Sequence, residues 1–345
     1  MNHSIVVMFR WGGLGDVLMA LAASRAVKIM RQAKVVLVTQ PAYHELARLC
    51  PSIDAVFSSA AEIKRLIQAP PEPSWPPAQA WKNAQMYDLG PAAFGLDPVH
   101  QVDAYLRIMG LEAPPDLKHL LLVLSPEAEA EAEAALTTRG WEASVRPVLV
   151  HAAKGDPNRT WPKENWRRLI QELQSLGHSV ALIGNTQADA DRGVHDLAIS
   201  GTLDLVNGLS LPGLVALMRR SALLVTTDSG PVQLAGATTI PIVGLYTVAP
   251  GRSRLPYRQG AAAWNAVAVE PACPHAPCYA AIMDRSAQAA FRAKTRVDPS
   301  DLPALFSKWC QAAEPYRCLE QEITVERVMG AITNLQPSQL SIETN

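Results

Sequence analysis

Three short segments of the sequence place charged side chains beside glycine or proline, each directly after an apolar run. They are Gly12 to Asp16, Lys154 to Pro162 and Thr227 to Pro231. Glycine at such a position lets a ligand approach the backbone, and the unpaired amides of a following helix favour an anion such as phosphate. The chemistry these segments suggest is the binding of a phosphorylated ligand, although helix capping or a solvated loop is the simpler interpretation of each one alone.

Two of these segments could handle a diphosphate group. Lys154 and Arg159 could neutralise a leaving diphosphate without a metal, or they could lie in solvent as ordinary loop cations. The Gly230-Pro231 pair opens an expected helix whose first amides fit a pyrophosphate, unless Asp228 or Ser229 simply caps it.

The first segment differs from the fingerprint of a nicotinamide dinucleotide site. That fingerprint needs a small residue where Leu18 stands and an acidic residue after the second strand, where Thr39 and Gln40 stand. A nicotinamide-dependent dehydrogenase is therefore disfavoured.

Three further patterns could belong to a metal or proton-transfer site. The Asp189-Ala190-Asp191 run matches the manganese motif of another class of sugar transferases, but it opens an expected helix, and we interpret it as capping. His151 ends an apolar run and is interpreted as a core histidine. Four of the five cysteines fall in the last quarter of the chain, where a reducing compartment leaves a structural metal or plain packing. These four are Cys273, Cys278, Cys310 and Cys318.

Composition excludes several classes of protein. The 345 residues are 48% hydrophobic and 18% charged, which indicates a soluble globular chain of two domains rather than a disordered one. A formal net charge of −1 gives no field that attracts nucleic acid. The first residues lack the pattern of a signal peptide, and the apolar run at residues 120–124 has the length of a core strand. We therefore expect a cytoplasmic protein.

Apolar runs alternate with helical patterns through both halves of the chain. The expected strands are residues 4–9, 34–39, 147–152, 179–183, 223–227 and 242–246. The expected helices start at residue 16 or span residues 42–49, 127–135, 163–176, 188–199, 211–220, 230–237 and 322–335. This alternation predicts an α/β chain with two Rossmann-like, doubly wound domains, whose ligand sites lie at the carboxyl ends of the strands. We expect the domains to span residues 1–143 and 144–321, with a C-terminal segment 322–345 whose helix crosses back to the first domain. The helix at 127–135 is expected to be exposed to solvent, and the proline-rich residues 69–77 to form a loop.

Five stretches, in this order, resemble glycosyltransferase family 9, the heptosyltransferases that build the inner core of bacterial lipopolysaccharide. They are residues 12–18; Arg159 to Pro162 with Trp166 and Leu169; Asp228 to Pro231 with Ala235 and Ala237; Pro241 to Tyr246 with Pro250, Arg252 and Pro256-Tyr257; and Cys278-Tyr279 with Cys318-Leu319 and residues 323–328. Together these stretches run across nearly the whole chain.

The resemblance implies a GT-B architecture with an interdomain cleft, and inverting sugar transfer without a catalytic metal. It implies ADP-heptose as the donor, bound on the C-terminal domain, and a lipopolysaccharide core or a protein as the acceptor. Asp16 takes the position of the general base that removes the proton of the acceptor hydroxyl. The implied donor contacts are Gly13, Lys154, Arg159, Trp161, Asp228, Ser229, Gly230, Pro231 and Gln233.

Two positions depart from the family's pattern near the expected donor site. Gln233 stands where the family usually has histidine, and residues 247–249 stand where Gly-Pro-Thr commonly follows. They leave two alternatives open: a catalytically silent nucleotide-sugar-binding or assembly protein, and a sugar-nucleotide epimerase.

No cofactor is implied for catalysis, and the four late cysteines are the candidates for a structural zinc or iron site. Peripheral contact with the inner membrane leaflet would use basic residues of the first domain, whose alternative is a solvated face. These residues are Lys28, Arg31, Lys34, Lys64 and Arg65.

Overall fold

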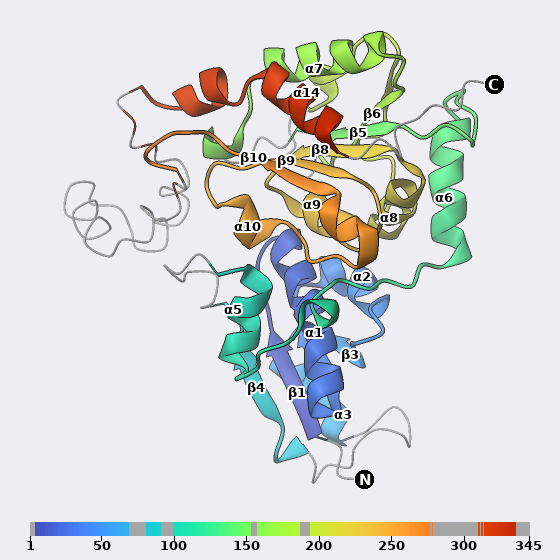
Figure 1. The fold of residues 1–345 in the computed structure, drawn as a ribbon. Coiled ribbons are helices and arrows are strands. Elements are labelled where there is room, and N and C mark those ends of the chain that lie inside the picture. The colour runs from blue at the N-terminus through green and yellow to red at the C-terminus, as the bar shows by residue number, and fades with distance from the viewer. Residues whose placement is uncertain are drawn as a thin grey trace, which may run out of the picture. The chain divides into compact units, whose positions relative to one another are not determined.

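The chain forms two compact units, each built on a parallel β-sheet (Figure 1). The computed structural model describes residues 4–68, 81–90, 99–152, 157–186, 194–276, 278, 310, 312 and 314–335. Unit 1 comprises Met1–Leu124 and Pro256–Gly260, and unit 2 comprises Ser125–Leu255 and Ala261–Asn345. The predicted α/β class is confirmed. Among the described residues, no helix combines the length and the apolar character needed to span a bilayer.

Unit 1 has a four-stranded sheet in the order β3-β2-β1-β4. The strands are β1 (Ser4–Phe9), β2 (Ala33–Val38), β3 (Ala55–Phe57) and β4 (Gln85–Asp88). The helices are α1 (Leu14–Arg31), α2 (His44–Arg48), α3 (Ala60–Gln68) and α5 (Gln101–Ile108), with 3-10 turns η1 (Pro41–Tyr43) and η3 (Pro115–Leu117). The apolar runs of β1 and β2 are buried along most of their length, as expected for inner strands of a parallel sheet covered by helices.

The segment Pro256–Gly260 is joined to unit 1 through a tyrosine. The Tyr257 hydroxyl donates to Asp103 Oδ2 at 2.6 Å, and its ring lies 4.2 Å from the His100 ring, centroid to centroid. Lys118 Nζ lies 2.6 Å from Asp103 Oδ1 and 5.1 Å from the centre of the tyrosine ring. These contacts bring a late part of the sequence into the first unit.

Unit 2 has a six-stranded sheet in the order β10-β9-β8-β5-β6-β7. The strands are β5 (Val148–His151), β6 (Val180–Leu182), β7 (Thr202–Asp204), β8 (Leu223–Thr227), β9 (Ile242–Leu245) and β10 (Ala266–Val269). The α-helices are α6 (Pro126–Thr137), α7 (Lys163–Ser175), α8 (Leu211–Arg220), α9 (Gly230–Ala235), α10 (Gly251–Arg254) and α14 (Val325–Asn334). Shorter turns are η4 (Pro157–Arg159), η6 (Val194–Leu197), η7 (Gly260–Trp264) and the π-helical η8 (Cys318–Glu322). Strand order reverses between β5 and β8, and ligands of open parallel sheets bind at such a reversal.

Helix α14 packs against α7 and against strands β9 and β10 of the unit 2 sheet. Its buried residues Val325, Val328 and Ile332 belong to the same hydrophobic cluster as Trp161 and Trp166. The C-terminal helix therefore completes the core on one side of this sheet.

Two sequence predictions differ from the structure. Residues 120–124 form no strand, although Leu120 and Leu122 are buried: the bond from Val123 N to Leu49 O joins them to a turn and not to a neighbouring strand. Helix α6 is only half exposed: it packs on α8, where Glu131 accepts from the backbone and hydroxyl of Ser210. The helix predicted at 188–199 and the loop at 69–77 lie partly or wholly outside the described residues.

Candidate functional site

Asp16 lies at the carboxyl end of the unit 1 sheet, in the first turn of α1. The helix begins at Leu14 with Gly13 as its N-cap, so Asp16 is the third helical residue and not the cap. Its Oδ2 accepts a hydrogen bond from Gly13 N at 3.1 Å, and its Oδ1 lies 2.8 Å from Arg10 Nη2. The Asp16 side chain is 29% exposed, so the carboxylate is held from one side and open on the other. The sequence analysis did not identify Arg10.

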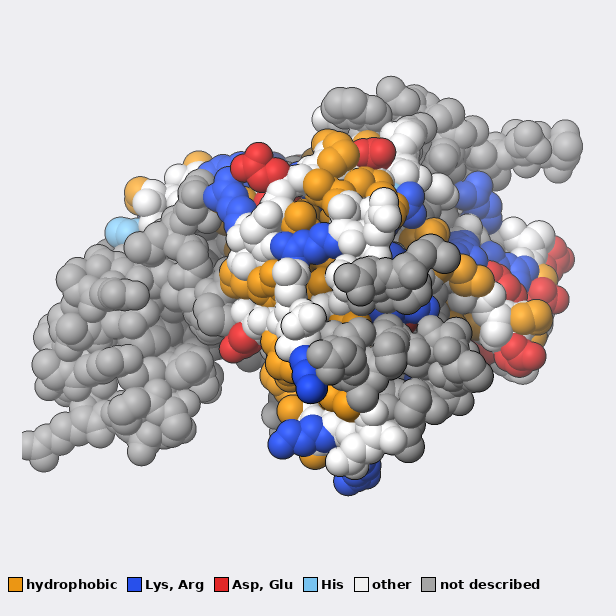
Figure 2. Space-filling view, turned by 90° about the horizontal axis from the view of Figure 1, so that it is seen from below, with side chains coloured by type: hydrophobic (Ala, Val, Ile, Leu, Met, Phe, Trp, Pro, Cys, Tyr) orange, Lys and Arg blue, Asp and Glu red, His pale blue; other side chains and the backbone are white. Residues whose placement is uncertain are grey.

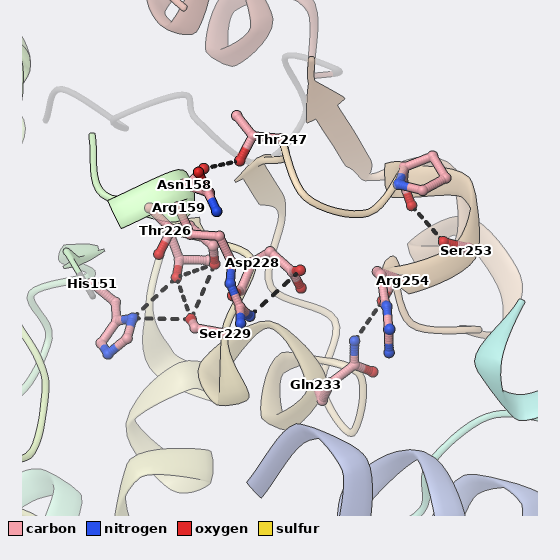
Figure 3. Close-up of polar contacts among 12 residues, drawn as sticks. His151, Asn158, Arg159, Thr226, Asp228, Ser229, Gln233, Thr247, Ser253 and Arg254 are labelled. Carbon is pink, nitrogen blue, oxygen red and sulfur yellow. Dashed lines mark hydrogen bonds and ion pairs between the residues drawn. The ribbon is translucent and has the colours of Figure 1, made fainter. Parts of the chain in front are cut away.

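In unit 2, three side chains meet where β5 and β8 end (Figure 3). His151 Nδ1 lies 3.2 Å from Thr226 Oγ1 and 3.1 Å from Ser229 Oγ, and the two hydroxyl oxygens are 3.1 Å apart. The Ser229 hydroxyl also contacts the Thr227 carbonyl at 3.0 Å, so it does not cap α9. His151 is 2% exposed, which confirms it as a buried histidine, but its ring has a definite role in orienting the loop that follows β8.

Arg159 reaches this same loop from η4 (Figure 3). Its Nη1 donates to the Asp228 carbonyl at 3.2 Å and lies 3.8 Å from Asp228 Oδ2. The Arg159 side chain is 38% exposed and the Asp228 side chain 14%. The Arg159 guanidinium therefore places a positive charge beside this loop, where it can attract an anion at the sheet edge.

Two buried hydroxyl groups lie beside Asp228 without a hydrogen-bond partner in the described structure. They are Thr227 Oγ1, at the end of β8, and the Tyr246 hydroxyl, directly after β9. Burial raises the pKa of Tyr246 well above its usual range, and the charge of Asp228 adds to this effect. Buried polar atoms are nearly always hydrogen-bonded, so these two hydroxyls indicate that a further polar group binds at the carboxyl edge of the unit 2 sheet.

Three further expected donor positions, Gly230, Pro231 and Gln233, have local roles in α9 and the segments it contacts. Gly230 and Pro231 form the first turn of α9, as predicted. Gln233 is buried, and its side-chain amide donates to the Arg254 carbonyl at the end of α10 (Figure 3). Gln233 therefore fixes the α10 segment, whatever else it contacts. Lys154, another expected donor contact, lies outside the described residues.

Trp161 lies inside the core of unit 2 and is only 1% exposed. Its ring meets the Trp166 ring edge to face, with centroids 4.9 Å apart at 87°, and its Nε1 donates to the Ile323 carbonyl at 2.7 Å. The structure therefore shows a packing role for Trp161 in the core of unit 2, and the expected donor contact stays a prediction.

The family model described as glycosyltransferase family 9 (heptosyltransferase) matches residues 101–280. The chain belongs to this family. It is therefore a glycosyltransferase. No curated protein sequence matches this family 9 enzyme.

Solved structures of related fold cover the family 9 enzyme almost completely. A glycosyltransferase family 9 protein from Veillonella parvula is 17% identical, with a TM-score of 0.65 over 97% of this chain and 98% of the other. The E. coli ADP-heptose lipopolysaccharide heptosyltransferase II is 15% identical, with a TM-score of 0.63 over 96% and 98%. The iron-containing dodecameric glycosyltransferase TibC of enterotoxigenic E. coli is 20% identical, with a TM-score of 0.62 over 96% and 78%. At these identities, the likeness establishes the fold alone.

The late cysteines of the family 9 enzyme lie near one another as free thiols. Burial, together with the nearby Cys318, Cys310 and Cys273, raises the pKa of Cys278 to about 12. Burial likewise raises the pKa of Cys318 to about 11. Within the part of the chain that the structure describes, however, no group of three or more His, Cys, Asp or Glu side chains is arranged to hold a metal ion.

Three of the five basic residues of unit 1 that were candidates for contact with a membrane have internal partners: Lys28, Arg31 and Lys34. Lys28 Nζ and Lys34 Nζ lie 2.6 and 3.0 Å from the two carboxylate oxygens of Asp54. Burial alone would raise the pKa of Asp54, but hydrogen bonds from Lys28, from Val35 N and from Lys34 outweigh it and lower the pKa. Arg31 donates to Gln85, to the Tyr87 hydroxyl and to the Met109 carbonyl. On the face shown in Figure 2, Lys and Arg side chains stand singly or in small groups between hydrophobic and neutral ones.

Proposed function

We propose that this family 9 enzyme transfers heptose, or a related sugar, from ADP-heptose to a lipopolysaccharide-core or protein acceptor. The reaction inverts the anomeric centre and uses no catalytic metal, and the chain has the GT-B arrangement of two Rossmann-like domains. The family match supports the activity, and two solved relatives are described as an ADP-heptose heptosyltransferase and as a complex with ADP-D-β-D-heptose.

The donor is proposed to bind at the carboxyl edge of the unit 2 sheet. The observation that carries this assignment is the pair of buried hydroxyls of Thr227 and Tyr246, near Asp228, that have no hydrogen-bond partner in the described structure. Arg159 supplies the positive charge that a departing diphosphate needs, and charge-assisted hydrogen bonds of this kind are strong. Ser229, held by His151, and the Gly230-Pro231 turn complete the polar edge.

The acceptor is proposed to meet Asp16 of unit 1. As the acceptor oxygen attacks the anomeric carbon, its proton moves to the Asp16 carboxylate and a carbon–oxygen bond forms. The bond between the anomeric carbon and the diphosphate oxygen breaks at the same time, and the nucleoside diphosphate leaves with that electron pair. General-base assistance of this kind contributes about 10²–10⁴ in rate.

Calorimetric titration with ADP, UDP and GDP tests the donor assignment. We expect selective binding of ADP, weakened at least tenfold by Arg159→Ala and unchanged by Asp16→Asn. Arg167→Ala is the matched control, because Arg167 is 39% exposed, lies on α7 and contacts Glu164 and Asp196 at a different surface. Preference for UDP or GDP would be compatible with a glycosyltransferase but would contradict ADP-heptose as the donor. The absence of any nucleotide binding would contradict the proposed function as a whole.

Transfer itself is tested by mass spectrometry of products from ADP-heptose with two kinds of acceptor, lipid A carrying inner-core sugar and bacterial surface polypeptides. We expect one acceptor class to gain a heptosyl mass, and Asp16→Asn to lower that rate by about 10²–10⁴. ADP binding without transfer to either class would instead support a silent nucleotide-sugar binder.

The cysteines carry a separate proposal, a structural zinc or iron ion held by Cys273, Cys278, Cys310 and Cys318. The thiolate set suits either metal, and TibC is described as containing iron, but the described geometry does not itself form a ligand set. No step of the transfer reaction passes through this ion. Elemental analysis of the purified protein decides the matter: about one metal per chain, lost in Cys278→Ser but kept in Cys50→Ser, would support it.

A further inference from the structure

Arg10 is a charged residue buried at the end of an apolar strand. It directly follows β1 and is 5% exposed. Its backbone is fixed by the bond from its amide to the Val38 carbonyl at 3.0 Å and by the Thr39 hydroxyl, which donates to its carbonyl at 2.8 Å. Burying a guanidinium is unfavourable unless it is paired and hydrogen-bonded, so its partners indicate why it is there.

All three nitrogens of the Arg10 guanidinium are engaged. Nη2 lies 2.8 Å from Asp16 Oδ1, Nε donates to the Tyr105 hydroxyl at 2.7 Å, and Nη1 donates to the Trp11 carbonyl. The Arg10 guanidinium also lies 5.6 Å from the centre of the Tyr105 ring. Tyr105 is itself fully buried on α5. The guanidinium is thus held by Tyr105 on α5 and by the Trp11 carbonyl, and its Nη2 faces the Asp16 carboxylate.

Two donors fix the Asp16 carboxylate, and its oxygens can still accept further hydrogen bonds. Arg10 takes one lone pair of Oδ1, and the Gly13 amide takes one of Oδ2. Each carboxylate oxygen retains a second lone pair, and the 29% exposure of the side chain leaves these open to another molecule.

Gly12 lies close to both the Asp16 carboxylate and the Arg10 guanidinium. Its φ of +147° is one that residues with a side chain rarely adopt. A methyl group added there would lie 2.7 Å from Asp16 Oδ2 and 3.1 Å from Arg10 Nη1. A side chain at position 12 would therefore push the carboxylate and the guanidinium apart.

We propose that Arg10 is a positioning residue, which holds the Asp16 carboxylate in the one orientation that lets it accept the proton of the acceptor hydroxyl. The assignment rests on the proposed function of Asp16. Arg10 itself does not contact the acceptor, because its side chain is 6% exposed and its nitrogens are already bonded. Its effect on the reaction passes through Asp16, with Tyr105 as its own support.

A double-mutant cycle on sugar transfer tests this proposal, with Arg10→Gln, Asp16→Asn and the two combined. We expect Arg10→Gln to lower kcat at least tenfold while the Kd for ADP stays within twofold. Arg10→Lys should recover part of the loss. In the Asp16→Asn background, Arg10→Gln should change kcat by less than about threefold, because effects that pass through one residue are not additive.

Arg31→Gln is the matched control. Arg31 also lies against a tyrosine ring, 5.4 Å from the centre of Tyr87, and donates to that hydroxyl and to a carbonyl, but at the other end of α1. We expect it to lower the melting temperature and leave kcat unchanged. If Arg10→Gln does not fold, Tyr105→Phe and Gly12→Ala take its place, since each disturbs the pair while Arg10 and Asp16 remain. Both should lower kcat.

The outcomes separate this proposal from the proposed function. If Asp16→Asn transfers sugar at the normal rate, Asp16 is not the base, and both fail. If Asp16→Asn is inactive but Arg10→Gln, or both substitutes, keep normal kcat, only the role of Arg10 is overturned. The role of Arg10 is also overturned if Arg10→Gln lowers kcat in the Asp16→Asn background by the same factor as in the unmodified enzyme. A crystal structure of Arg10→Gln gives a readout without activity, and there we expect the Asp16 side chain in an altered orientation.

Discussion

Replacing Trp161 with phenylalanine distinguishes a core residue from a donor contact. The substitution keeps an aromatic ring in the core but removes the indole N–H that donates to the Ile323 carbonyl at 2.7 Å. A buried carbonyl left unpaired costs about 1–3 kcal/mol, and the smaller ring about 1–2 kcal/mol more. We therefore expect Trp161→Phe to lower the free energy of unfolding by about 2–5 kcal/mol, which corresponds to a melting temperature lower by roughly 4–20 °C.

The assay is thermal unfolding followed by circular dichroism, combined with ADP titration at a temperature where the variant is fully folded. Trp166→Phe is the control, because it alters the other ring of the same contact and keeps the bond from Trp161 to Ile323. We expect it to be less destabilising than Trp161→Phe by about 1–3 kcal/mol. The reasoning is refuted if the folded Trp161→Phe binds ADP more than tenfold more weakly, or if the two variants are equally stable.

Two further predictions concern unit 1. Tyr257→Phe removes the hydroxyl that donates to Asp103 at 2.6 Å and should lower the unfolding free energy by about 1–2 kcal/mol, measured from the urea midpoint at constant slope; an unchanged midpoint would contradict it. The pKa of Asp54 is lower in the folded state than in the unfolded chain, so the stabilisation from Lys28 and Lys34 is present above about pH 4 and is lost as the pH falls through the folded-state value. Asp54→Asn should lower stability at pH 7 and flatten its decline in acid, as measured by urea unfolding between pH 7 and 3, whereas a parallel pH dependence would show that the pair contributes nothing.

The sequence predicts best those elements whose residues are buried on both sides. β1, β8 and β9 are continuous apolar runs because helices cover the sheets, and each was predicted to within a residue of its ends. Strand β4, by contrast, is Gln-Met-Tyr-Asp at the edge of its sheet and is mostly exposed, so no apolar pattern marks it. Residues 120–124 have the apolar run without a partner strand, and pairing is a property of the fold that no local pattern contains.

The candidate site was predictable where one segment carries it, and not where distant segments meet. The glycine turn before Asp16 and the loop after β8 are local patterns. Arg10 was missed because Tyr105, the buried residue that supports it, is 95 positions away. Its only sign in the sequence is an arginine after an apolar strand and before two glycines. Trp161 shows a second limit, since its position in a motif indicates that the residue matters but does not show that its ring packs in the core.

The membership of Pro256–Gly260 in unit 1 has a consequence for how the chain is made. Its bond from Tyr257 to Asp103 joins residues 154 positions apart. On the ribosome, domains generally fold in order from the N-terminus. Unit 1 cannot be completed in that way, because strands β5 to β9 of unit 2 are synthesised before Tyr257 emerges. The nascent first unit therefore lacks the contact between Tyr257 and Asp103 until much of the second unit has left the exit tunnel. Fragments cut between residues 143 and 144 should likewise yield an N-terminal half without its closing segment.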